Sequence, residues 1–276
     1  MPRLIHTGQP LVDETVEVPS LPRSGDNVMA TSCSREAGGS INILVATARQ
    51  GVDAVLAGAV GAGSTGDLIR QVAAREGIAV PAPPIEGADT GICFVMVEPS
   101  AERTFVTTLG AERQLSLDIL EASAPASGDI VCLTGYSFVV ESTAAPHRAW
   151  LPKLPEGVGV VLDPGAAFAG LPEAERADLL ALIDVWTGNA DEAEALTDET
   201  EMGAAAAAVA ALLRPDAVVI VRDGPAGCAV HVDGLTTLVP GFPQTPIDTN
   251  GAGDAHTGIL LAARLSGVDW VEACRR

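Results

Sequence analysis

Short, uninterrupted runs of apolar residues recur along the chain, and each ends in a glycine or a polar residue. The runs are VDAVLAGAVG, GDIVCLTG, VGVVLDPG, IDVWTGN and DAVVIVRDG. Runs of this length without polar alternation are typical of strands that are buried on both faces, as in a parallel sheet. The pattern therefore predicts a sheet whose strands are mostly parallel.

Segments rich in strong helix formers lie between these runs. SINILVATARQ ends at Gly51 and STGDLIRQVAARE ends at Gly77, and glycine at such positions favours a helix C-terminus. EAERADLLALI and EMGAAAAAVAALL have the same helical character. The alternation of strands and helices predicts a doubly wound α/β fold, in which ligands bind at the carboxyl ends of the strands.

Two regions, 9–36 and 88–110, interrupt this alternation. Both hold β-branched, partly alternating runs separated by Pro, Ser and Gly, which indicates short antiparallel strands and hairpins. Together they predict a small sheet that acts as a lid and excludes water from a site. Surface hairpins without a lid function are the alternative. Exposed strand edges in such a lid would also favour a homodimer formed through it.

Length and composition are those of one large globular domain over residues 1–276, with 47% apolar residues. No apolar run is long enough to cross a bilayer, and MPRLIHTGQP lacks the basic flank and apolar block of a secretory signal. These features favour the cytoplasm. The cysteines are scattered, without a C-x-x-C, and indicate neither a disulfide framework nor a zinc site. We interpret them as small core residues: Cys33, Cys93, Cys132, Cys228 and Cys274.

The formal net charge of −20 argues against binding to nucleic acid or to an anionic membrane surface, because both need a basic footprint. Lys153 is the only lysine, so a P-loop is excluded. Any phosphate group must therefore be bound by backbone amides, arginines and a metal ion.

One loop, IDTNGAGDAH at 247–256, precedes the apolar run TGILLAARL and offers such an anion site. Gly251, Ala252 and Gly253 form the first turn of a predicted helix, where unpaired amides and the helix dipole attract an anion. Asp254 follows directly and could accept a proton from an attacking hydroxyl group. A glycine turn with an aspartate at the helix start is the structural alternative.

The same loop resembles the D-T-x-G-A-G-D signature of the ribokinase-like (PfkB) carbohydrate kinases, and other family signatures recur in the same order. The matching segments are G-x-x-x-x-D at Gly8 and Asp13, AGGSIN at 37–42, N-x-x-E at Asn189 and Glu192, and VRDGPAG with Gly224 and Gly227. The resemblance spans nearly the whole chain.

This resemblance implies an ATP-dependent phosphotransferase that acts on a hydroxyl group of a small sugar, sugar derivative or nucleoside. Asp254 would be the catalytic base, and the amides of Gly251, Ala252 and Gly253 would stabilise the transferred phosphoryl group. The family pattern further implies an Mg²⁺ ion bound through Asn189 and Glu192, and a monovalent cation such as K⁺.

The resemblance also implies which residues bind the two substrates. The acceptor would contact Asp13, Gly38, Gly39, Asn42, Gly110, Ala111 and Asp248. The nucleotide would contact Asn189, Arg222, Gly224, Gly227 and Thr249. Acidic and amide side chains suit the recognition of a polyol through hydrogen bonds.

The chain departs from the family pattern in four respects. His256 replaces an aromatic residue, and Ser40 replaces a lysine that is frequent in ribokinases, which disfavours ribose. The absence of lysine near the lid disfavours a phosphorylated sugar, although Arg35, Arg103 and Arg113 remain available. The chain ends at WVEACRR, so we expect the adenine-closing helices of the family to be missing.

Two other functions are compatible with parts of the sequence. GAGSTG at 61–66 is a formal G-x-G-x-x-G, and Glu86 follows about 20 residues later, as in a nicotinamide-dependent oxidoreductase. Glu86 lies in the proline-rich PAPPIEG, however, and not at a strand end. The second alternative is a protein of the same fold that binds a sugar or nucleoside without catalysis, which the presence of Asp254 beside the glycine loop disfavours.

Overall fold

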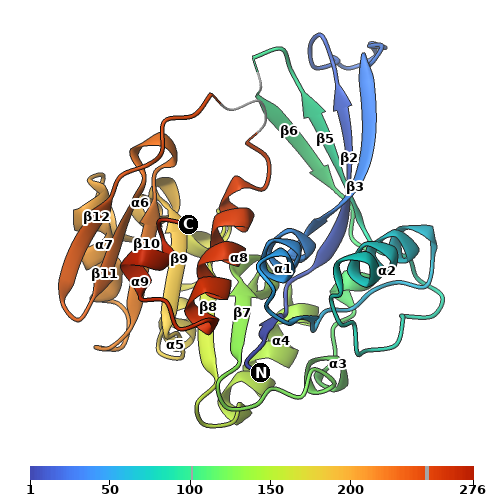
Figure 1. Cartoon of the computed structure of the whole chain (residues 1–276). Coiled ribbons are helices and arrows are strands. Elements are labelled where there is room, and N and C mark those ends of the chain that lie inside the picture. The colour runs from blue at the N-terminus through green and yellow to red at the C-terminus, as the bar shows by residue number, and fades with distance from the viewer. Residues whose placement is uncertain (101, 246–248) are drawn as a thin grey trace.

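The computed structural model describes residues 1–100, 102–245 and 249–276. These residues form a large sheet with helices on both faces and a small sheet that stands beside it (Figure 1). The strand order of the large sheet is β12-β11-β10-β9-β8-β7-β1-β4. All pairs from β10 to β4 are parallel, and β11 and β12 extend the sheet in antiparallel fashion.

The five apolar runs form β4, β7, β8, β9 and β10, which confirms the predicted parallel sheet. Three strands were not predicted: the three-residue β1 and the hairpin of β11 and β12. The bounds are β1 Leu4–His6, β4 Ala54–Leu56, β7 Ile130–Thr134, β8 Gly159–Asp163, β9 Val185–Asn189, β10 Val218–Arg222, β11 Cys228–Val232 and β12 Leu235–Val239.

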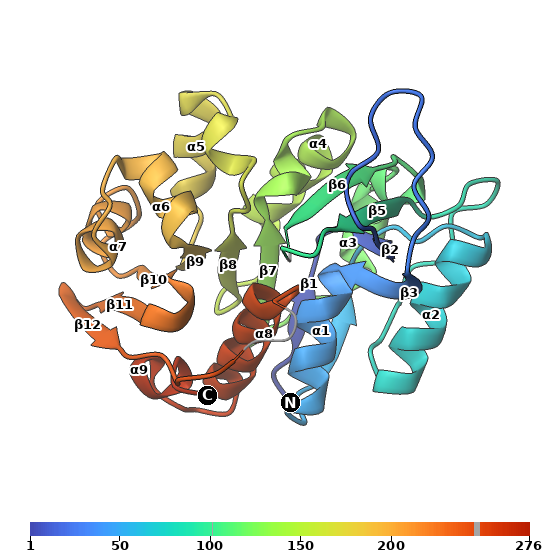
Figure 2. The ribbon, with the colours of Figure 1, turned by 90° about the horizontal axis from the view of Figure 1, so that it is seen from above.

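Helices cover both faces of the large sheet, as Figure 2 shows from above. The alternation along β7 illustrates why: Val131 and Leu133 belong to one apolar cluster, and Cys132 belongs to the other. The first cluster contains residues of α3 Leu117–Glu121, α4 Glu141–Trp150, α5 Glu173–Leu180, α6 Ala190–Thr197 and α7 Met202–Ala210. The second contains residues of α1 Ser40–Arg49, α2 Ser64–Glu76, α8 Ala252–Leu265 and α9 Trp270–Ala273. The doubly wound α/β fold is therefore confirmed.

The small sheet has the order β3-β2-β5-β6, with bounds β2 Pro10–Glu17, β3 Ser32–Gly39, β5 Ile92–Val97 and β6 Arg103–Thr107. The pairs β2–β3 and β5–β6 are antiparallel, as predicted. The central pair β2–β5 is parallel, which differs from the expected antiparallel arrangement. The chain between these strands includes α1, β4 and α2, and a connection of this length allows parallel pairing.

Two further features concern the sequence predictions. Cys93, Cys132, Cys228 and Cys274 are buried, but Cys33 is exposed, so its prediction as a core residue is wrong. None of the helices in the described part of the chain is both long and apolar enough to span a bilayer.

Candidate active site

Two cavities border the N-terminal turn of α8. A cavity of about 590 Å³ lies at the carboxyl ends of β8, β9 and β10, and we call it the sheet-edge cavity. A second, of about 900 Å³, lies between the small sheet and α1, and we call it the small-sheet cavity. Gly251 lines the small-sheet cavity, whereas Ala252, Gly253 and Asp254 line the sheet-edge cavity. The start of α8 therefore separates the two spaces.

The turn itself depends on a glycine. Gly251 is the N-cap residue of α8 with a φ of 69°, in the left-handed region that favours glycine, and among the described residues no side chain caps the helix there. The amide of Ala252 donates to the carbonyl of Thr249 at 3.2 Å. The remaining amides of the first turn have no intrahelical acceptor by virtue of their position, so they can bind an anion.

Asp254 is positioned by a contact with α1. The amide nitrogen of Asn42 donates a hydrogen bond of 2.9 Å to its carboxylate. Burial raises the pKa of Asp254 to about 6, and the neighbouring carboxylates of Asp163 and Asp13 act in the same direction, against the opposing effects of Asn42 and Arg222. A carboxylate with a pKa near neutrality suits a general base.

Arg222, at the end of β10, is held by several acceptors around the sheet-edge cavity. It donates to the carbonyl oxygens of Gly253 at 2.6 Å, Gly188 at 3.3 Å and Thr187 at 3.3 Å. It also lies 3.4 Å from the carboxylate of Asp163. The guanidinium group is thereby fixed beside the first turn of α8, where its positive charge would favour an anion.

Asp163 is a site residue that the sequence analysis missed. It is the last residue of β8 and lines the sheet-edge cavity, where the hydroxyl of Thr257 approaches its carboxylate at 3.4 Å. Burial raises its pKa. The sequence does contain a signal for Asp163, because it is the acidic residue at the end of the predicted strand VGVVLDPG. Ligands of this fold bind at the carboxyl ends of strands.

Asn189 and Glu192 both line the sheet-edge cavity and form the N-terminal capping box of α6. The Asn189 side chain accepts from the Glu192 amide at 2.7 Å, and the Glu192 carboxylate accepts from the Asn189 amide at 2.8 Å. Burial raises the pKa of Glu192, and the nearby Asp163 adds to this effect. The oxygen-rich set of Asp163, Asn189 and Glu192 has the chemistry that Mg²⁺ prefers.

The remaining residues predicted to bind the nucleotide divide into two groups. Gly224 and Gly227 line the sheet-edge cavity at the turn before β11. A side chain at Gly227 would meet the carbonyl of Val239 at 2.0 Å, so the turn requires glycine. Thr249 is not among the described residues that line this cavity. Its hydroxyl instead accepts a hydrogen bond of 3.1 Å from Arg103 of β6.

The residues predicted to bind the acceptor also divide. Asp13 and Asn42 line the small-sheet cavity, and a Cβ atom at Gly38 would lie 2.3 Å from the Asp13 carboxylate. Burial raises the pKa of Asp13, as does the charge of Glu36. Gly39 has a φ of 60°, and a Cβ atom there would approach the carbonyl of Gln9 at 2.4 Å.

Gly110 and Ala111 are not among the described residues that line the small-sheet cavity. They pack at the base of the small sheet, where the Ala111 amide donates to the carbonyl of Asp89 at 2.8 Å. Asp248 was also assigned to the acceptor site, and it lies outside the described residues.

The glycine motif at 61–66 has an internal partner. The carboxylate of Asp89 accepts from the amides of Thr65 at 3.0 Å and Gly66 at 2.9 Å, at the start of α2. A Cβ atom at Gly63 would lie 2.3 Å from the same carboxylate. Because Asp89 occupies the place that a pyrophosphate takes in a dinucleotide-binding fold, the oxidoreductase alternative loses its main support.

Comparison with known proteins places the chain in a family. The model of the pfkB family carbohydrate kinases matches residues 10–276. An uncharacterized sugar kinase of Escherichia coli, YegV, is 29% identical over 269 residues, covering 96% of this chain and 83% of that protein. The ribokinase of Haemophilus influenzae is 29% identical over 268 residues, covering 95% and 85%. The structure of adenosine kinase from Sinorhizobium meliloti has a TM-score of 0.82 at 19% identity, covering 99% and 90%.

The chain therefore belongs to the pfkB family of carbohydrate kinases. Its fold and enzyme class are those that the sequence motifs predicted, and a carbohydrate kinase is favoured over a non-catalytic binding protein.

Proposed function

We propose that this kinase transfers the terminal phosphoryl group of Mg·ATP to a hydroxyl group of a small, uncharged sugar, sugar derivative or nucleoside. The observation that carries the proposal is the position of the α8 N-terminus between two cavities, with Asp254 in its first turn. A phosphoryl donor on one side and an alcohol on the other would meet at this turn.

The sheet-edge cavity suits the nucleotide. Arg222 and the first amides of α8 provide positive charge without lysine, as the composition requires. Asp163, Asn189 and Glu192 would hold Mg²⁺, which would neutralise charge on the phosphates. The turn at Gly224 and Gly227 borders the same space. The K⁺ requirement stays a prediction.

The small-sheet cavity suits an uncharged polyol. Asp13, Glu36 and Asn42 line it, and their oxygen atoms accept hydrogen bonds from hydroxyl groups. A phosphorylated acceptor would require cationic groups, and the four described arginines that line this cavity already have partners in the protein. Arg49 and Arg75 both pair with Glu76. Arg35 pairs with Glu14 at 2.7 Å, and Arg103 donates to Thr249.

The geometry supports a direct, base-assisted transfer. Asn42 orients the carboxylate of Asp254. A carboxylate oxygen of Asp254 would accept the proton of the attacking hydroxyl group. The first amides of α8 and the guanidinium group of Arg222 would stabilise negative charge on the phosphoryl group during its transfer. The small sheet would exclude water from this region as a lid.

The test is ADP release from Mg·ATP across a panel of pentoses, ketohexoses, inositols and nucleosides, with sugar phosphates as a separate set. One strong acceptor whose turnover is lost in Asp254→Asn and retained in Asp216→Asn, an exposed aspartate away from both cavities, would support the proposal. Turnover that survives in Asp254→Asn, or a preference for the phosphorylated set, would contradict it.

The exposed face of the small sheet supports a homodimer. Phe94 of β5 and Val106 of β6 are directly paired across the strands and are 44% and 54% exposed. Val95 and Val97, which alternate with Phe94, line the cavity on the opposite face. An exposed apolar pair beside an edge strand invites association with a second copy.

A further inference from the structure

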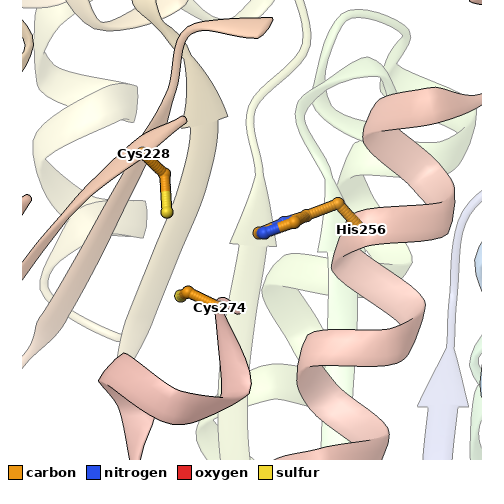
Figure 3. Close-up of side chains that lie close together, drawn as sticks. All are labelled: Cys228, His256 and Cys274. Atoms are coloured by element: carbon orange, nitrogen blue, oxygen red, sulfur yellow. The ribbon is translucent and has the colours of Figure 1, made fainter. Parts of the chain in front are cut away.

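Three side chains with strong affinity for soft metal ions meet in the wall of the sheet-edge cavity. Cys228 begins β11, His256 lies in the second turn of α8, and Cys274 follows α9 directly. Their sulfur and nitrogen atoms all lie within 4.8 Å of one another. Figure 3 shows the imidazole of His256 pointing toward the two thiols from the facing helix.

The surroundings hold these groups in place. Cys228 is 3% exposed and Cys274 is 7% exposed, so neither thiol is a surface group. The guanidinium group of Arg264 in α8 lies 4.3 Å from the ring centroid of Trp270, which fixes the start of α9 against α8. Cys274 thus reaches the cluster from a short helix whose position is set by packing.

The chemistry of the cluster differs from that of the rest of the cavity. Nδ1 of His256 is buried and has no hydrogen-bond partner among the described residues, which is costly unless another group binds there. Asp163, Asn189 and Glu192 offer oxygen atoms alone and form a separate, harder set.

The spacing is close to that of a tetrahedral centre. With zinc–sulfur distances of about 2.3 Å and zinc–nitrogen distances of about 2.0 Å, the ligand atoms of a tetrahedral site lie roughly 3.5–3.8 Å apart. Small rotations of the side chains would bring the cluster to this separation. All three residues line the sheet-edge cavity, so a fourth position would face its interior.

We propose that Cys228, His256 and Cys274 bind a Zn²⁺ ion in the wall of the sheet-edge cavity, with the fourth coordination position open to the cavity. Two thiolates, one imidazole and an open position are a known ligand set for zinc. The site joins β11 to the two consecutive helices α8 and α9. Its existence does not depend on the proposed kinase reaction, and it can be tested without substrate.

The test measures metal binding by the full chain, fully reduced, stripped of metal with a chelator, and kept in millimolar Mg²⁺ to occupy oxygen-rich sites. Zn²⁺ is titrated in competition with a chromogenic chelator, and Co²⁺ serves as a spectroscopic probe. We expect one Zn²⁺ per chain, a thiolate-to-cobalt charge-transfer band, and a rise in the melting temperature on loading.

Variants locate the site. Cys228→Ser, His256→Gln and Cys274→Ser should each weaken Zn²⁺ binding at least tenfold, and the two serine variants should reduce the charge-transfer band. Cys33→Ser is the matched control, because its thiol is exposed and remote from the cluster. His256→Gln changes a half-buried residue and keeps the core intact, so it tests the site even if a serine variant fails to fold.

Three results would overturn the proposal. The first is a Co²⁺ spectrum of the reduced wild-type protein without thiolate character. The second is Zn²⁺ affinity that survives in His256→Gln. The third is a pair of thiols that form a disulfide on oxidation but bind no Zn²⁺ when reduced, which would assign Cys228 and Cys274 to redox chemistry instead.

Discussion

Asn42 and Asp254 are separated by 212 positions in the sequence, yet the Asn42 amide donates a 2.9 Å hydrogen bond to the Asp254 carboxylate. The contact joins α1, which lines the small-sheet cavity, to the turn that borders the sheet-edge cavity. The proposed base is therefore oriented by a residue that also lines the proposed acceptor cavity.

Replacement of Asp254 should separate binding from chemistry. Asp254→Asn keeps the shape of the side chain but removes the proton acceptor, so we expect kcat to fall by about 10²–10⁴-fold, the usual contribution of a general base. The KM values should change little. Steady-state ADP release and isothermal titration of both ligands measure the two effects, and a variant with near-normal kcat would remove Asp254 from this role.

The pH profile should report the same carboxylate. Because the pKa of Asp254 is raised to about 6, kcat/KM should fall below pH 6 as the base becomes protonated. The Asn42 hydrogen bond favours the charged form, so its loss in Asn42→Ala should raise the pKa and move the acidic limb to higher pH. A limb that stays in place would show that another group controls the profile.

Asp254→Asn should lower activity but raise the stability of the fold at neutral and alkaline pH. The pKa of Asp254 is higher in the folded chain, about 6, than the ordinary value of 3.8, so the charged form destabilises the fold above pH 6. Asp254→Asn should therefore raise the free energy of unfolding at pH 8 by up to roughly 3 kcal/mol. Its advantage should shrink as the pH falls from 6 to below 4. Urea unfolding at pH 4 and pH 8 measures this, and an equal effect at both values would contradict the assignment.

Gly38 provides a test of the acceptor cavity. In Gly38→Ala the added Cβ atom would lie 2.3 Å from the Asp13 carboxylate and displace it. We expect the KM for the acceptor to rise at least tenfold, while nucleotide affinity is unchanged. Gly170→Ala is the control, because nothing lies within 4 Å of its Cβ position. A rise in nucleotide Kd of similar size would indicate a global effect instead.

The dimer prediction can be tested on the exposed face of the small sheet. Val106→Glu places a charge beside Phe94 and should shift the sedimentation coefficient from dimer to monomer at micromolar concentration. Leu235→Glu changes a residue of β12 that is 71% exposed, and should leave association unchanged. Wild-type protein that sediments only as a monomer would refute the dimer itself.

The parts of the fold that were predictable from sequence are those with strong local signals. The runs that form β7, β8 and β10 are apolar throughout, and their burial on both faces follows from that pattern. The LIH segment of β1 is too short to show a period, although it lies between β7 and β4 in the sheet. The parallel pairing of β2 with β5 depends on the long connection between them and carries no local signal.

The residues of the proposed sites also differ in how far a local sequence signal identifies them. Gly251 and Asp254 were identifiable because a glycine turn and an acid lie within one short loop. Asp163 required knowledge of where β8 ends relative to its neighbours. Cys228 and Cys274 are 46 positions apart, as their numbers show, and no spacing rule predicts that they meet His256. The packing of β11, α8 and α9 brings these three side chains together, so the cluster can be identified only from the three-dimensional structure.

The capping box of Asn189 and Glu192 has a thermodynamic consequence for cation binding. Each side chain is already fixed by the backbone amide of the other at the start of α6. A cation that binds at this edge would meet donors whose rotamers are set by the fold, so little side-chain entropy would be lost on binding. The same two residues thus stabilise the start of α6 and would offer the proposed Mg²⁺ ion side chains whose rotamers are already set.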